Sequence, residues 1–134
     1  MLKSIEISTA KNQELIDITD RIKQILKDSG IKQGICIVYV PHTTAGVLIN
    51  ENYDSNLCED IIRKLNDVIP LHDNYKHDRV DSNAHSHIKA SLIGPSEIII
   101  IKNNELQLGR WQGIALAEFD GPRKRKIFVK IIKG

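Results

Sequence analysis

The chain has 134 residues, which is enough for one domain with a substantial hydrophobic core. A formal net charge of +2 is too small to indicate nucleic-acid binding, and 4% aromatic residues argue against a stacking surface for single strands. No stretch approaches the roughly 20 apolar residues of a membrane span, and no signal peptide is evident. Cys36 and Cys58 lie in apolar surroundings typical of free thiols. We therefore expect one cytoplasmic domain over residues 1–134, with no nucleic-acid or membrane partner.

The first half of the chain predicts strands that alternate with two helices. Thr19 has the character of an N-cap, and Gly30 followed by Ile31 is typical of a helix end. Asp54 is expected to cap the second helix, whose apolar residues recur at helical spacing until Pro70. The expected strands in this half are residues 2–8, 14–18, 35–40 and 46–50.

The second half begins with a long polar stretch, residues 71–83, of a length usually found in functional or disordered loops. A short helix follows from Ala84. Its helical spacing predicts a buried stripe of Ala84, Ile88 and Leu92, with His87 and Ser91 beside the stripe and His85 and Lys89 about 100° further round. Asn103 and Asn104 predict a hairpin turn. The expected strands here are residues 97–102, 105–109, 113–120 and 126–132.

These elements predict an α+β fold: a single domain with a curved, largely antiparallel or mixed β-sheet of about eight strands and about three helices. No internal repeat or linker interrupts it. The isoleucine-rich strands are apolar on both faces, and three helices cannot cover every face. Self-association is the simplest way to cover the remaining apolar surface.

Three histidines lie in polar surroundings that suit a metal site: His42, His77 and His87. Three imidazoles with an open fourth position are typical of catalytic zinc, although scattered surface histidines remain the alternative. His85 and His87 are two positions apart, so on a helix they point about 200° apart and only one can serve such a site. The predicted stripe favours His87.

Other polar residues have both a chemical and an ordinary explanation. Glu51 could be a ligand, a general base or an orienting partner, or simply an acid before a helix. Trp111 lies between glycines, which permit close ligand approach, but it could equally close one end of the sheet. Arg123 begins a basic run that suits phosphate oxygens, although a solvated basic turn is the alternative. Phosphate loops, dinucleotide fingerprints and nucleophile elbows are absent.

Several motifs together resemble the YjbQ family, which is often labelled secondary thiamine-phosphate synthase. Their order and spacing match over nearly the whole chain. The matching segments are Pro41-His42-Thr43-Thr44-Ala45-Gly46, Asn50-Glu51-Asn52, Asn74-Tyr75-Lys76-His77-Asp78, His87-Ile88-Lys89-Ala90-Ser91-Leu92-Ile93-Gly94, Gly109-Arg110-Trp111-Gln112-Gly113-Ile114 and Glu118-Phe119-Asp120-Gly121-Pro122-Arg123.

The resemblance implies a compact α+β homotrimer with a metal-containing active site. It implies that the metal ligands are His42, His77 and His87, and that Glu51, Glu118, Lys89 and Ser91 take part in catalysis. The substrate-binding residues implied are Arg123, Trp111, Gln112 and Asn50. His85 and His72 are not part of the implied pattern.

The implied reaction joins hydroxymethylpyrimidine diphosphate to thiazole phosphate as a secondary activity of a metal-assisted enzyme that acts on phosphorylated small molecules. The ligand types favour zinc, with magnesium as an alternative. A metal-dependent hydrolase of a phosphate or related ester, and a non-catalytic ligand-binding trimer with a structural metal, are the other interpretations.

Overall fold

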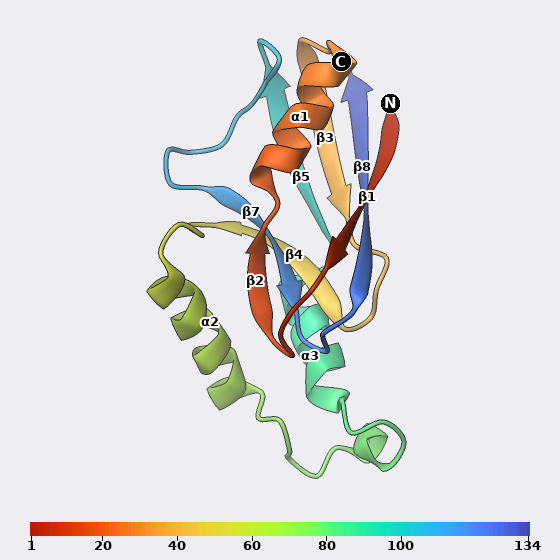
Figure 1. Cartoon of the computed structure of the whole chain (residues 1–134), viewed down its shortest axis with the longest axis vertical. Coiled ribbons are helices and arrows are strands. Elements are labelled where there is room, and N and C mark those ends of the chain that lie inside the picture. The colour runs from red at the N-terminus through yellow and green to blue at the C-terminus, as the bar shows by residue number, and fades with distance from the viewer.

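Two antiparallel sheets form the body of the protein in the computed structural model, which describes residues 1–134 (Figure 1). A five-stranded sheet has the order β1-β8-β3-β5-β6, and a three-stranded sheet has the order β2-β7-β4. The strands are β1 (Leu2–Ser8), β2 (Glu14–Asp17), β3 (Gln33–Tyr39), β4 (Ala45–Asn50), β5 (Ser96–Lys102), β6 (Glu105–Leu106), β7 (Gly113–Glu118) and β8 (Lys124–Lys133).

Three α-helices and one 3-10 helix connect and cover these strands. They are α1 (Thr19–Ser29), α2 (Ser55–Val68), η1 (Lys76–Arg79) and α3 (Ala84–Ile93). In Figure 1, α1 lies at the upper end of the molecule, α2 stands at one side, and α3 and η1 form the lower end. The predicted α+β class, with eight strands and three α-helices, is confirmed, and every strand pairing is antiparallel.

Local sequence signals explain where several elements begin and end. Gly30 adopts a positive φ of 68° at the end of α1, a conformation that glycine adopts without steric cost. The Asp54 carboxylate accepts a 2.9 Å hydrogen bond from the Asn56 amide and so caps α2. Asn103 and Asn104 both have positive φ, 54° and 60°, as a two-residue hairpin turn between β5 and β6 requires.

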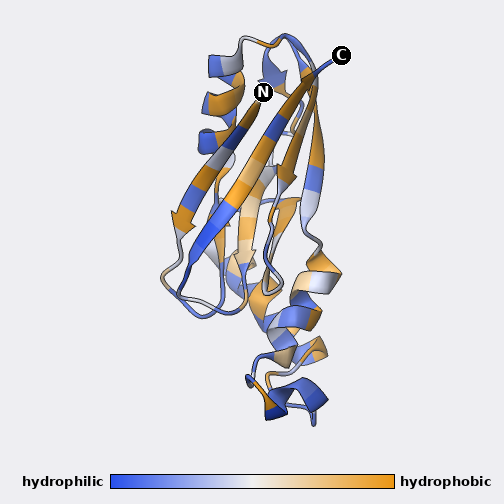
Figure 2. Cartoon of the chain, turned by 90° about the vertical axis from the view of Figure 1, so that its right-hand side faces the viewer, coloured by the Kyte–Doolittle hydropathy of each residue, from blue (hydrophilic) through white to orange (hydrophobic).

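The main core lies between the two sheets and α1. Seventeen buried apolar residues form it, and apolar positions recur along the strands in Figure 2. All six residues of β7 are buried because this strand is central in the smaller sheet and is covered on both faces. The last of them is Glu118, so the fold places a carboxylate inside the protein.

Two apolar surfaces are incompletely covered within one chain. The helix α2 has no fully buried residue, although its apolar residues lie on one face. The outer face of the five-stranded sheet exposes Ile98 by 63% and Ile100 by 61%. None of the helices combines the length and the apolar character that crossing a membrane requires.

Candidate functional site

The helix α3 buries a different face from the one that its spacing predicted. Ile88 and Leu92 are 42% and 64% exposed, so the expected stripe is wrong beyond Ala84. The buried residues of α3 are Ala84, His85, Ser86, Lys89 and Ala90. The small residues allow close packing, since the Ser86 hydroxyl donates a 2.6 Å hydrogen bond to the Phe119 carbonyl. Consequently His85 is the inward histidine, and His87 is not.

Lys89 is fully buried and has three hydrogen-bond partners around its Nζ atom. These partners are His85 Nδ1 at 2.7 Å, Asn66 Oδ1 at 2.6 Å and Gln13 Oε1 at 3.2 Å. An ammonium has three protons and no lone pair, so three acceptors match the charged form. Burial lowers the pKa of Lys89 to about 8, which still leaves the group charged at pH 7.

This arrangement assigns the tautomer of His85. If Lys89 donates to Nδ1, the imidazole is neutral and its proton is on Nε2. Burial, and secondly the charge of Lys89, lowers the pKa of His85 below its ordinary value. The Ser86 hydroxyl lies 3.4 Å from Nε2. With its proton on Nε2, the buried His85 can donate to the Ser86 hydroxyl at the start of α3.

Polar groups converge at the same end of α3. The Asn83 amide donates a 2.9 Å hydrogen bond to Asp120 Oδ2, and Arg123 Nη2 donates to the same oxygen at 3.0 Å. Asp78 accepts a 3.0 Å bond from the Ala84 amide. The carbonyl oxygen of the Asn83 side chain is buried without a partner. A buried acceptor of this kind is costly unless it is satisfied.

Glu118 and Arg125 form a buried ion pair next to this cluster. Arg125 Nε lies 2.9 Å from Glu118 Oε1, and Thr9 Oγ1 donates to that oxygen at 2.8 Å. Arg125 Nη2 also bonds Glu118 Oε2 and the Thr44 hydroxyl, the latter at 2.9 Å. These contacts join three distant segments of the chain. The pairing of Glu118 thus favours a structural role over the catalytic role that the resemblance implied.

One chain does not assemble the three predicted metal ligands. The rings of His77 and His87 meet edge to face, 4.9 Å apart, but His42 follows β3 and its Nε2 accepts a hydrogen bond from the Lys126 amide at 2.9 Å. No group of three or more His, Cys, Asp or Glu side chains is arranged to hold a metal ion. The donor set of a single chain therefore does not fit a metal.

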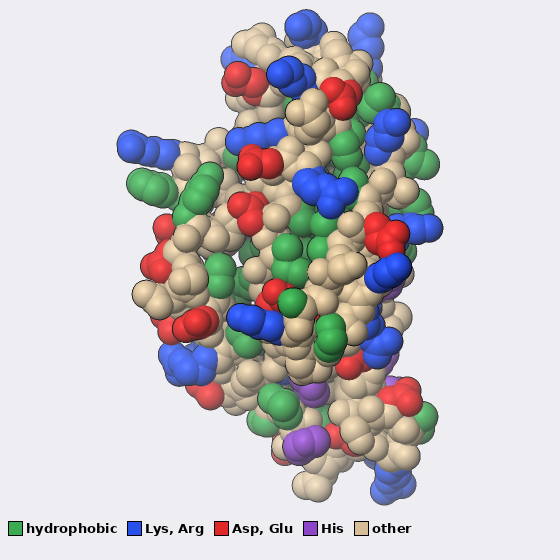
Figure 3. Space-filling model, viewed as in Figure 1, with side chains coloured by type: hydrophobic (Ala, Val, Ile, Leu, Met, Phe, Trp, Pro, Cys, Tyr) green, Lys and Arg blue, Asp and Glu red, His purple; other side chains and the backbone are tan.

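The remaining predicted residues divide between two regions. Arg123 lies in the cluster at α3, whereas Ser91 is exposed and its hydroxyl donates to the His87 carbonyl at 2.9 Å. The others lie at the far ends of β4 and β7, where Asn50 pairs with Gly113. This second group consists of Asn50, Glu51, Trp111 and Gln112. In Figure 3 the visible histidines lie at the lower end of the molecule, around α3.

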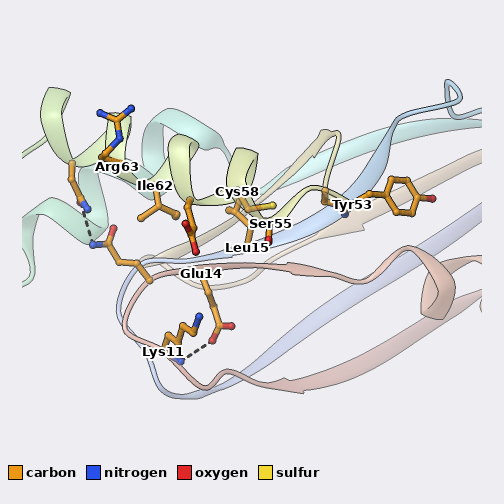
Figure 4. Close-up of a pocket in the computed structure, with 12 residues that line it drawn as sticks. Lys11, Glu14, Leu15, Tyr53, Ser55, Cys58, Ile62 and Arg63 are labelled. Carbon is orange, nitrogen blue, oxygen red and sulfur yellow. Dashed lines mark hydrogen bonds between the residues drawn. The ribbon is translucent and has the colours of Figure 1, made fainter.

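Sequence reasoning did not identify a cavity of about 450 Å³ between α2 and β2 (Figure 4). Leu15, Cys58 and Ile62 form apolar parts of its wall, and Tyr53 points away from them at one end. Gln13 and Asn66 also line it, and these are the two amides that bind Lys89. Gln13 and Asn66 therefore lie between this cavity and the buried Lys89–His85 pair. The amphipathic sequence pattern of α2 did not indicate that this helix lines a cavity.

The fold and the buried cluster define a small antiparallel α+β domain with a histidine site at one end. The chain belongs to the YjbQ family: the family model described as "UPF0047 protein YjbQ-like" matches residues 3–134. The resemblance noted from the motifs is thereby confirmed.

Relatives and solved structures agree with this assignment. A UPF0047 protein of Methanocaldococcus jannaschii is 50% identical, with 98% of this chain and 94% of the relative covered. The UPF0047 protein YugU of Bacillus subtilis is 42% identical, with 98% and 99% covered. A Sulfolobus solfataricus crystal structure, described as a YbjQ-like protein of unknown function, has a TM-score of 0.97 at 40% identity and covers 100% of this chain and 97% of its own.

Proposed function

We propose that this protein is an enzyme that acts on a phosphorylated small molecule, with the reacting group at the start of α3. The observation that carries the proposal is the Lys89–His85 hydrogen bond, because it supports a neutral imidazole with its proton on Nε2, 3.4 Å from the Ser86 hydroxyl. The N-terminal end of a helix favours negative charge, and Arg123 lies in the same cluster through Asp120. A helix terminus and a guanidinium suit phosphate oxygens, which would compete here with the carboxylates of Asp78 and Asp120 for the Ala84 amide and for Arg123.

In this proposal His85 donates to an oxygen of the departing group, and Lys89 positions His85 without touching the substrate. Charge that develops on the departing oxygen is stabilised by donors that are already oriented. A divalent metal remains a separate prediction, and its ligands would have to include groups beyond those of one chain.

The finer proposal is the secondary thiamine-phosphate synthase reaction. A thiazole nitrogen attacks the methylene carbon of hydroxymethylpyrimidine diphosphate, and the carbon–oxygen bond to diphosphate breaks. Diphosphate leaves with the electron pair, and the products are thiamine phosphate and diphosphate. Stabilisation of the leaving diphosphate is the contribution that His85 and Arg123 would make.

The test compares wild type with His85→Ala in the synthase reaction and in a panel of phosphate esters, each with and without added zinc or magnesium. Loss of the acid–base group is expected to lower the rate by about 10²- to 10⁴-fold. His72→Ala is the matched control, because this histidine is outside the implied site and its side chain is 79% exposed. If wild type hydrolyses a phosphate ester but does not join the two thiamine precursors, the protein is a hydrolase. Full activity of His85→Ala in every reaction would contradict the proposal.

We also propose that the protein works as a homotrimer. The support is the uncovered outer face of the five-stranded sheet, where neighbouring strands present apolar residues in register. Ile37 of β3 lies opposite Ile98 of β5, and Ile35 lies opposite Ile100. An exposed patch of this kind is typical of an interface between subunits.

A further inference from the structure

The cavity between α2 and β2 shares no residue with the polar cluster at the start of α3. Its volume of about 450 Å³ is within the range of small-molecule sites in proteins. Leu15 of β2 and Cys58 and Ile62 of α2 form its apolar wall (Figure 4). Burial, more than the nearby carboxylates, raises the pKa of the Cys58 thiol, so this thiol is uncharged at pH 7. The cavity can therefore accommodate an apolar group of a bound molecule.

Another part of the wall is polar, and the buried Lys89 fixes its orientation. Lys89 Nζ donates hydrogen bonds to Asn66 Oδ1 at 2.6 Å and to Gln13 Oε1 at 3.2 Å. Because an ammonium can only donate, each of the two side-chain amides must turn its oxygen towards Lys89. Neither amide can exchange the positions of its oxygen and nitrogen without losing this hydrogen bond. The positions of their NH2 groups are therefore fixed as well.

This orientation leaves the NH2 group of Asn66 as a donor without a partner. Gln13 Nε2 donates to Asn66 Oδ1 at 3.1 Å, so that oxygen already accepts two hydrogen bonds. Asn66 Nδ2 makes no hydrogen bond within the chain and is accessible rather than buried. Cys58, Ile62 and Asn66 are each four residues apart, so they lie on one face of α2. A hydrogen-bond donor therefore follows the apolar wall along a single face of the helix.

The charged side chains of the cavity balance one another. Two are basic, Lys11 and Arg63, and two are acidic, Glu14 and Glu59. The Glu14 carboxylate already accepts two backbone N–H groups at 2.7 Å each. Arg63 already lies 3.5 Å and 3.9 Å from two carboxylates of its own helix. A lining with balanced charge favours an uncharged ligand over an anion or a cation.

We propose that the α2–β2 cavity is a binding site for a small uncharged molecule with an apolar body and a hydrogen-bond acceptor, such as a carbonyl oxygen, that faces the Asn66 NH2 group. The apolar body contacts Leu15, Cys58 and Ile62. The Lys89 ammonium makes this wall selective, because an acceptor meets N–H groups there, whereas a donor finds the Asn66 oxygen already occupied. Binding at this site does not depend on the proposed reaction at α3.

Two probes of similar shape test the recognition of an acceptor. Acetophenone has a carbonyl oxygen where α-methylstyrene has a CH2 group, and neither molecule is charged. ¹H–¹⁵N NMR of the side-chain amides of Gln13 and Asn66 reports binding at this wall directly. We expect acetophenone to shift both amide signals and to bind with a Kd of about 1 mM, as is reasonable for a molecule with so few atoms.

The variant Asn66→Asp removes the NH2 group and keeps an oxygen for Lys89. Its affinity for acetophenone should fall about fivefold, the effect of one lost hydrogen bond, whereas its affinity for α-methylstyrene should change little. The comparison between the two probes separates the hydrogen bond from the general effect of a new charge. Asn56→Asp is the matched control, because Asn56 is exposed on the same helix and lies outside the cavity. This control should bind both probes as wild type does.

Three results would overturn the proposal. Acetophenone could leave the Gln13 and Asn66 signals unchanged, which would show that nothing binds at this wall. Asn66→Asp could weaken both probes equally, which would identify an apolar space that does not recognise an acceptor. Asn56→Asp could weaken acetophenone as much as Asn66→Asp does, which would assign the effect to charge alone. None of these measurements uses a substrate, so each result is independent of the His85→Ala activity test.

Discussion

Lys89 Nζ lies 2.7 Å from Nδ1 of His85, one helical turn earlier on α3. This contact converts a buried charge into an orienting group, because an ammonium donates and an imidazole nitrogen must then accept. The opposite ring nitrogen is left protonated at the polar end of the helix.

Lys89→Met should lower activity because His85 would no longer be held in one tautomer. We expect a loss of about 10- to 100-fold, the range typical of partners that orient a functional imidazole. Steady-state kinetics should show the loss in kcat more than in KM. The double variant with His85→Ala should be no slower than His85→Ala alone, and an additive loss would contradict an effect that acts through His85.

The stability contributed by Lys89 should increase at alkaline pH. Burial lowers its pKa from 10.5 to about 8, so between these values the unfolded chain binds more protons than the folded chain. Stability therefore rises with pH across this window, by about 3 kcal/mol for the full shift. The measurement is the unfolding free energy of wild type minus that of Lys89→Met at pH 7.5 and pH 10. A difference that does not grow with pH would contradict the assignment.

Glu118→Gln should mainly lower the free energy of unfolding and have a smaller effect on catalytic activity. The substitution leaves Arg125 buried without its counter-charge, and breaking a buried pair typically costs about 3–5 kcal/mol. Denaturant unfolding measures this loss. Glu6→Gln is the control, because Glu6 is 63% exposed in its pair with Lys124 and such pairs contribute little. Unchanged stability of Glu118→Gln would identify Glu118 as a free functional acid.

The secondary structure was largely predictable from local signals, because caps, turns and strand patterns act over a few residues. Gly30, Asp54 and the Asn103–Asn104 turn each have the predicted conformation or contact. The polar segment 71–83 contains η1, which no periodic pattern indicated. The short strand β6 ends at Leu106 rather than at residue 109.

The site was less predictable because it depends on which face of α3 is buried. Apolar spacing favoured Ile88 and Leu92, but close packing of Ser86 and Ala90 turns that face outward. The signal that would have identified the buried face is the pattern of small residues combined with the pairing of His85 and Lys89. Arg125 was also missed, since a basic run on a strand gives no indication that one member is buried.

Ile98→Glu should weaken self-association, because a carboxylate would replace an apolar group that is 63% exposed on the outer sheet face. Light scattering after size exclusion should show a lower mass than for wild type. Val68→Glu is the control, since Val68 is 66% exposed on α2, away from that sheet. An unchanged mass for Ile98→Glu would place the interface elsewhere.

The most direct test of the account is ¹⁵N NMR of the imidazole nitrogens of His85 at pH 7. The Lys89 contact predicts a neutral ring with the proton on Nε2 and none on Nδ1. In Lys89→Met the same ring should become a mixture of tautomers or gain charge. A protonated Nδ1 in wild type would contradict the account, because Lys89 could not then donate to it as an ammonium.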